Sequence, residues 1–515
     1  MTVYSPESFT GKGRVVSTKG FAWAVVWCVA VAVLVACGES ASRSDRPVVV
    51  IGEETTFVTG PVTADGRVDF VAAYNEFAGA GVTRETNAAA ALVEAIGMPD
   101  YLANNKSAAQ AQAVRLLGVT PGKPRPTVYL DSDLVHSGPW KASDSPEAAE
   151  AARQLAQLQV ALDAGVAATR RPHWFFPAVT TDDPANPLAI PVLSSHRSLA
   201  KLLVARGFLR LGEGDAPSAW RDIQAASRLG RHLRQEPHLF GLLVAMAGTA
   251  LSDVATQRLA LHVTDRAILE EMLRDVADRP VQNADRTLWG QRLFDIAILL
   301  TIWHDPGKHN DLFDNFDVGT WRELSEAEEK RVVAAIWQAD PNVVLRAFNR
   351  MADERDALLR MDDRAGAMVA HKAYDARRIK MENSLLDRLP ALNASPEEKT
   401  QWCADAAGTL DTMPWRIRDL LDRVEQTRRI TMTVVALELH KLDHGAYPDS
   451  LDALSPAYLQ AVPTDLYTGR PMIYRVHDDT YDLYSVGHDG IDDGGMYPND
   501  ILSETMRIRD EALEQ

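Results

Sequence analysis

Apolar side chains recur at the spacing of an α-helix through a long central part of this chain. From residue 146 to residue 414, many segments carry apolar residues at i, i+3 or i+4 and i+7, with Arg, Asp and Glu on the opposite face. This pattern predicts a mainly α fold. The expected helices are 146–169, 193–212, 216–234, 237–262, 266–278, 282–303, 325–338, 341–361, 363–387 and 397–409.

Two of these segments are joined by a very short turn. The tetrapeptide Gly-Glu-Gly-Asp at 212–215 separates 193–212 from 216–234 and predicts an αα-hairpin. The small and apolar residues of this pair resemble, faintly, a tetratricopeptide unit. No repeat of about 34 residues persists along the chain, however. We therefore expect an irregular helical array rather than a repeat protein.

Length and charge limit the classes of protein that the chain can belong to. At 515 residues it is too long for one ordinary domain, and its 46% hydrophobic content is enough for a sizeable core. The formal net charge of −17 disfavours nucleic acid as a partner, because nucleic acid is itself a polyanion. We expect two or three domains and no nucleic-acid binding.

The N-terminal segment has the form of an export signal. Basic residues precede an unbroken apolar run, 21–36, which is shorter than the ~20 residues that span a bilayer. The run ends in Leu34-Val-Ala-Cys37-Gly, which resembles the lipobox of bacterial lipoproteins and implies that Cys37 carries a lipid. An uncleaved membrane anchor is an alternative. So is prepilin-type cleavage after Gly20, although Val25 stands where that signal has Glu.

All three interpretations place the body of the protein in the cell envelope, attached to the membrane and facing the periplasm or the exterior. Residues 48–142 are mixed in pattern, with a possible strand at 48–52 and helices expected at 84–96 and 107–117. The organisation predicted is a signal or anchor (1–37), a tether (38–47), a mixed region (48–142), a helical domain (146–414), a small module (415–503) and a helical tail (504–515).

The C-terminal module contains a loop unusually rich in oxygen ligands. Residues 485–500, SVGHDGIDDGGMYPND, hold four Asp, one Asn and four Gly, with no Lys or Arg. So many carboxylates repel one another unless a cation lies among them. Calcium suits such a loop, because it takes about six to eight oxygen ligands from carboxylates, amides and carbonyls. An EF-hand is excluded, since its third position would be Ile491 and a strand precedes the loop.

The module as a whole resembles the C-terminal domain of the major pseudopilin of type II secretion systems. The matches run in order and are LDHGAYP (442–448), Tyr458-Leu459, PTD (463–465), GRP (469–471), Tyr474, YDLYSVGHDG (481–490), Gly494-Gly495 and NDI (499–501). The resemblance implies a small α+β module with a short antiparallel sheet and a calcium ion. The ligands that it implies are the Val486 carbonyl and the side chains of Asp489 and Asp500, with Asp493 and Asn499 as weaker candidates.

Two features depart from the pseudopilin pattern. Leu466 stands where the family usually has Pro. More importantly, about 400 residues separate the apolar segment from the module. The helix before the module carries Arg423, Arg428 and Glu438, and therefore cannot lie in a membrane. We expect a borrowed module rather than a subunit that polymerises.

Other motifs support an enzyme only weakly. No G-x-S-x-G and no Walker A sequence is present. His304 and Asp305 are metal-type ligands without diagnostic spacing, and the aromatic stretch 170–179 could line a groove but more often such clusters form core. Cys403 has no basic neighbour and is expected to be buried.

Taken together, the residues predict a non-enzymatic envelope lipoprotein. Its helical scaffold would carry a calcium-stabilised module for contacts with envelope or secretion-apparatus proteins, linked through the resemblance to type II secretion. The alternatives left open are a secreted metal-dependent hydrolase, with its site near His304 or Trp174, and a ligand-binding receptor that uses 170–179.

Overall fold

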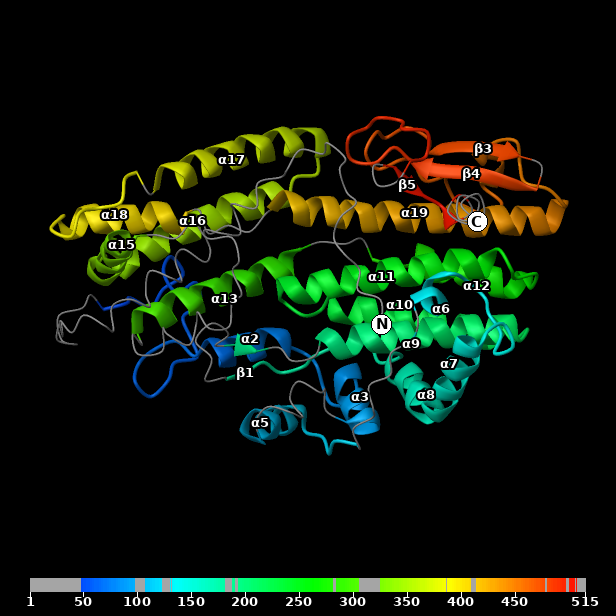
Figure 1. Cartoon of the computed structure of the whole chain (residues 1–515), viewed down its shortest axis with the longest axis horizontal. Coiled ribbons are helices and arrows are strands. Elements are labelled where there is room, and N and C mark those ends of the chain that lie inside the picture. Colours follow the sequence, from blue (N-terminus) through cyan, green and yellow to red (C-terminus); the bar gives the residue numbers. More distant parts are fainter. Residues whose placement is uncertain are drawn as a thin grey trace.

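The computed structural model describes residues 48–97, 107–122, 130, 132–180, 188–189, 193–280, 284–304, 325–385, 387–408, 414–477, 479–496, 500–504 and 506. It is mainly helical with a small antiparallel sheet near the C-terminus, which confirms the predicted fold class (Figure 1). The first helices are α2 (Phe70–Ala78), α3 (Ala88–Ile96), α5 (Ser107–Leu117), α6 (Ser132–His136), α7 (Pro146–Gln157) and α8 (Gln159–Ala168). The later helices are α9 (Leu193–Gly212), α10 (Ala216–Leu233), α11 (Leu239–Ala260), α12 (Arg266–Ala277), α13 (Asp285–His304), α15 (Glu326–Gln338), α16 (Pro341–Leu359), α17 (Arg364–Leu385), α18 (Pro396–Ala407) and α19 (Pro414–His444).

Helix starts follow local capping chemistry, which explains why the predicted boundaries are close to the observed ones. Ser325 and Ser395 each form a capping box with the Glu three residues on, Glu328 and Glu398. Asp215 caps α10 by accepting from the Ser218 amide. The segment 146–169 was expected to be one helix and is instead broken at Leu158, where no Pro or Gly marks the break.

The predicted αα-hairpin is present, since α9 and α10 pack along each other. Its two helices are joined in the interior by an ion-pair cluster. Both oxygens of the buried Asp222 carboxylate accept from guanidinium groups, at 2.6 Å from Arg206 and 2.7 Å from Arg210. Charged groups survive burial here because each has an opposite charge and a hydrogen bond.

The strand expected at 48–52 is wrong. This segment forms no strand, and its backbone groups make hydrogen bonds with side chains of α16. Asn342 donates to the Val48 carbonyl and accepts from the Val50 amide. Asn349 donates to the carbonyls of Glu54 and Thr55. Because helix side chains satisfy these groups, the segment needs no sheet partner.

The C-terminal region is built on the long helix α19. The helix ends at Gly445, which adopts a positive φ of 80°. The short helix η4 (Leu451–Leu454) and strands β3 (Ile473–His477), β4 (Thr480–Ser485) and β5 (Ile501–Leu502) follow, in the antiparallel order β3-β4-β5. In Figure 1 the sheet covers one side of α19, while α11 and α12 lie along the other.

One hydrophobic core runs through both sides of α19. Val434 and Leu437 of α19, Leu483 of β4 and Leu259 of α11 all belong to the same buried cluster. A second small antiparallel pair, β1 (Val179–Thr180) and β2 (Leu188–Ala189), lies elsewhere in the chain. The C-terminal sheet therefore shares one hydrophobic core with the helical array and is not a separately packed module.

Within the described part of the chain, α11 is long and apolar enough to cross a membrane by length and composition, and 56% of its apolar window is buried. It contacts α9, α10, α13 and α19. It also carries Asp253, which is fully buried and paired with Arg279. These contacts make α11 the central helix of the core.

Candidate functional site

The acidic loop lies between β4 and β5 in the chain. Gly495 adopts a positive φ of 81°, and a Cβ at this position would collide with the Met506 side chain. The positive φ is the reason that the loop needs glycine here, because the Met506 methyl group is the free end of a flexible side chain and can move aside. This turn brings the end of the loop, Asp500, beneath the backbone of Gly495 and Met496.

Asp500 is the most unusual residue of the loop. Its side chain is only 1% exposed. Oδ2 accepts from the amides of Gly495 at 2.8 Å and Met496 at 3.2 Å, whereas the buried Oδ1 has no hydrogen-bond partner among the described residues. Burial raises the pKa of Asp500, and the nearby carboxylates of Asp493 and Asp492 raise it further, against the two backbone donors. A buried carboxylate oxygen without a partner is costly, and a bound cation would remove that cost.

The other predicted calcium ligands differ in burial and in hydrogen bonding. Val486 is buried, and its amide donates to Asp465 Oδ2 at 3.1 Å. Asp493 acts electrostatically on Asp500. Asp489 is exposed and accepts from the Ile491 amide at 3.1 Å. Asn499 lies outside the described residues.

The carboxylates of the loop offer oxygen atoms, which are the ligands that calcium prefers. Over the described residues, no three His, Cys, Asp or Glu side chains gather closely enough to hold a metal ion. Calcium needs fewer side chains than this, because backbone carbonyls and amide oxygens supply part of its shell. Asp500 with its unpaired oxygen, the neighbouring Asp493 and the loop carbonyls are the groups present here that would hold it.

Sequence reasoning missed the structural roles of two aspartates. Asp492 accepts from the Tyr484 hydroxyl at 2.8 Å and the Gly494 amide at 2.9 Å, and these bonds hold its pKa below the usual range. Asp465 is buried and joins its own turn to Val486. Both aspartates shape the loop with hydrogen bonds. An Asp two residues before a Gly, as at Asp492, was the available signal for a turn.

The departure at Leu466 also has a structural reason. Its amide donates to Gln426 Oε1 of α19 at 2.7 Å in a buried position. Proline has no amide hydrogen and could not make this bond. The residue that breaks the family pattern thus fastens the turn after Asp465 to α19.

The loop is also anchored in the helical array. Four residues beyond Asp500, the Glu504 carboxylate pairs with Arg258 of α11 at 2.7 Å, with the two side chains 2% and 5% exposed. The Glu504 amide donates to Gln257 Oε1, and Gln257 in turn donates to Thr431 of α19, each at 2.9 Å. Arg258 and Glu504 lie 246 positions apart, so no local pattern could have revealed the pair.

The outer side of the loop faces α17 across a cavity of about 430 Å³. His488 and Asp489 form the loop wall, and His371, Lys372 and Asp375 belong to α17. Burial lowers the pKa of His371. Asp489 is thus placed on a surface shared with the helical region, whereas Asp500 is placed inside the loop.

The aromatic stretch 170–179, one of the alternative sites, contributes buried side chains to the core. Trp174 and Phe176, from the aromatic stretch 170–179, are 1% exposed and pack as core. The Trp174 indole donates to Glu236 at 2.6 Å, and the Tyr74 hydroxyl donates to the other oxygen of the same carboxylate at 2.9 Å. Cys403 is fully buried, as expected. His304 is the last residue of α13, and Asp305 lies outside the described residues.

No protein-family model, no curated protein and no solved structure matches this chain. The resemblance to the pseudopilin module and to the lipobox therefore stays a prediction.

Proposed function

We propose that this protein is a non-enzymatic scaffold of the cell envelope whose C-terminal module is locked by calcium. The membrane would hold its N-terminus through Cys37, and the module and helical array would dock envelope or secretion-apparatus proteins. The proposal assigns no catalytic step to the chain.

The observation that carries the proposal is the buried Oδ1 of Asp500, which has no hydrogen-bond partner within the part of the chain that the structure describes. In a loop with further carboxylates nearby, that atom is a natural ligand for a hard cation. Millimolar calcium, as found outside the cytoplasm, is enough to fill even a weak site. Occupation would replace mutual repulsion of Asp500, Asp493 and Asp492 by attraction to one ion.

The coupling of the loop to the helices supports a role in assembly. Glu504 and Arg258 connect the end of the loop to α11, and Gln257 extends this connection to α19. Calcium bound at Asp500 would therefore stabilise the fold beyond the loop. A surface that is already ordered suits a docking protein, because binding then loses less conformational entropy in the loop and its side chains.

Thermal unfolding of the full chain, with and without calcium, tests the metal site. Asp500→Asn keeps the side-chain shape and removes the buried charge. Without calcium this variant should be at least as stable as the wild type, because no unpaired carboxylate is buried. Calcium should increase the free energy of unfolding of the wild type, by about 2.7 kcal/mol when its concentration reaches 100 times Kd. The variant should gain no stability from calcium.

The matched control is Asp452→Asn, at an exposed position in η4 of the same module. It should respond to calcium as the wild type does. An equal calcium response in the Asp500 variant, or none in the wild type, would remove calcium from the proposal.

The docking role needs a separate measurement. The full chain, immobilised with calcium, should retain specific components of a detergent-solubilised envelope extract, and Asp500→Asn or a chelator should release them. Retention of the same components regardless of calcium would argue against a calcium-locked interface. Recovery of no envelope component would argue against docking altogether.

A further inference from the structure

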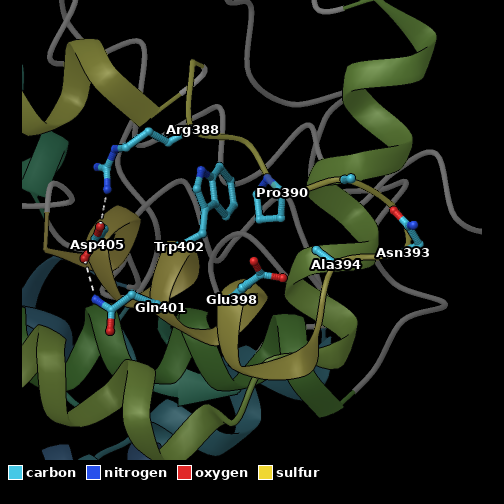
Figure 2. Close-up of a pocket in the computed structure, with 9 residues that line it drawn as sticks. Arg388, Pro390, Asn393, Ala394, Glu398, Gln401, Trp402 and Asp405 are labelled. Carbon is cyan, nitrogen blue, oxygen red and sulfur yellow. Dashed lines mark hydrogen bonds and ion pairs between the residues drawn. The ribbon is translucent and has the colours of Figure 1, made fainter.

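A second cavity lies at the end of the molecule away from the acidic loop. Its volume is about 600 Å³, within the range of small-molecule sites. The turn between α17 and α18 forms one wall and the exposed side of α18 forms the other (Figure 2). The residues that line the cavity include Arg388, Pro390, Asn393, Glu398, Gln401 and Trp402.

Hydrogen bonds from two basic side chains hold the turn on the side away from the cavity. Arg331 of α15 donates to the carbonyls of Leu389 and Pro390. Lys399, only 1% exposed, donates to the Leu392 carbonyl at 2.6 Å and to Gln338 at 2.8 Å. These cations fix the turn from its inner side, so the cavity is formed before any ligand arrives.

The charged groups of the cavity are largely satisfied among themselves. Arg388 pairs with Asp405 Oδ2 at 2.6 Å, and Gln401 donates to Asp405 Oδ1 at 2.8 Å, as Figure 2 shows. Glu398 uses one oxygen to cap the Ser395 amide and keeps a negative charge. No unmatched cation remains among the lining residues, which disfavours phosphates, carboxylates and peptide C-termini as ligands.

The remaining surface combines amides with apolar carbon. Asn393 is exposed, and its side-chain amide can both donate and accept, as can the outer part of Gln401. Trp402 is 5% exposed and packs largely in the core, and its indole N–H is bonded to the Leu385 carbonyl at 2.9 Å, so the part of the side chain that lines the cavity offers only carbon atoms. Pro390 adds a second apolar surface. A purely apolar ligand would cover the exposed Asn393 amide and Glu398 carboxylate without replacing their hydrogen bonds to water, at a cost.

We infer that this cavity binds a saccharide, either a neutral sugar or an amino sugar. Sugar hydroxyls donate and accept at once, which matches the amides of Asn393 and Gln401. The C–H faces of a sugar ring match Trp402 and Pro390. The negative charge of Glu398 tolerates a neutral or cationic ring and opposes an acidic one.

The position of the cavity suits a glycan of the envelope. The first described residues, from Val48, are bonded to Asn342 at the start of α16, and the preceding Asp340 amide donates to Thr400 of α18 at 2.9 Å. Val48, the first described residue, is therefore connected through the start of α16 to α18, which forms one wall of the cavity. This step rests on the envelope location proposed above: there, the site would attach the scaffold to a glycan of the envelope without involving the acidic loop.

Saturation-transfer NMR and calorimetry on the full chain test the inference. The probes are glucose, maltose, glucosamine and N-acetylglucosamine with its short oligomers. The double variant Asn393→Ala/Gln401→Ala should weaken binding at least about tenfold, since each lost hydrogen bond matters on that scale. Gln157→Ala, at an exposed position of α7, should bind as the wild type does.

Ala391→Trp provides an independent variant, because it fills the cavity at an exposed position and removes no hydrogen bond. It should abolish sugar binding and leave the melting temperature unchanged. Binding of the neutral sugars alone, or of the amino sugars alone, identifies the kind of glycan. The inference is overturned if no probe binds, or if Ala391→Trp binds sugar as tightly as the wild type.

Discussion

Arg258 Nε and Glu504 Oε2 lie 2.7 Å apart in the protein interior, although the residues come from α11 and from the chain beyond β5. This pair fastens the segment that follows the acidic loop and β5 to the helical core. It makes the C-terminal segment part of the cooperative fold.

Removing one partner of this pair should destabilise the whole chain. Arg258→Met leaves the Glu504 carboxylate buried without its cation, and we expect a loss of about 3–5 kcal/mol in the free energy of unfolding. Urea denaturation measures this change. The double variant Arg258→Met/Glu504→Leu should recover a large part of the loss, because no lone charge then remains. If Arg258→Met unfolds at the wild-type midpoint, the pair is not an anchor.

The buried Glu236 should make stability depend on pH. Burial raises the pKa of Glu236 from 4.5 to about 7, despite donors from Tyr74 and Trp174. The folded state therefore holds this proton more tightly than the unfolded state does. The resulting stability is fully present below pH 4.5 and is lost as pH rises through about 7. Glu236→Gln should remove this loss without changing the side-chain shape.

His232 and His238 give the opposite dependence. Burial lowers the pKa of each to about 4, so their contribution to stability is lost as pH falls from 6.5 towards 4. The two windows overlap and the effects have opposite signs, so melting temperatures of the wild type and of Glu236→Gln are compared from pH 4 to pH 8; the difference between them should change between pH 4.5 and about 7. Tyr74→Phe, which keeps the carboxylate, is the control that should retain a pH dependence. An unchanged curve in Glu236→Gln would show that Glu236 does not titrate in this range.

Leu466→Pro, which restores the residue expected from the pseudopilin pattern, should destabilise this protein. It removes the amide that donates to Gln426 at 2.7 Å and leaves a buried acceptor unpaired, at a cost of about 1–3 kcal/mol. Leu466→Ala keeps the amide and separates the hydrogen bond from the loss of the buried side chain. Chemical denaturation should therefore show the proline variant to be less stable than the alanine variant. The reverse order would mean that the Gln426 bond contributes little.

Cys403 should be unreactive in the native protein. It is fully buried, and burial raises the pKa of its thiol, so little thiolate forms at neutral pH. In a chain that begins after residue 37, Cys403 is the only cysteine. A thiol reagent should label it only at the rate of unfolding, and fully in denaturant. Fast labelling under native conditions would contradict the buried position.

Local patterns determined the elements of this protein. Apolar spacing and capping residues such as Ser395 are read within one or two helical turns, so the helix boundaries from α9 to α18 could be predicted closely. Elements that depend on distant partners were missed. The extended segment at residue 48 resembles a strand by composition, and only Asn342, nearly 300 positions away, decides otherwise.

The acidic loop shows the same division. Its composition indicated an oxygen-rich cation site, because carboxylates and glycines are visible in the sequence itself. Only the tertiary structure distinguished Asp500, whose buried Oδ1 has no partner among the described residues, from Asp492, which holds the loop, and Asp489, which faces α17. It also decided that the loop ends in an ion pair with α11. Burial and long-range pairing arise from the packing of the whole chain, and for that reason no local pattern contains them.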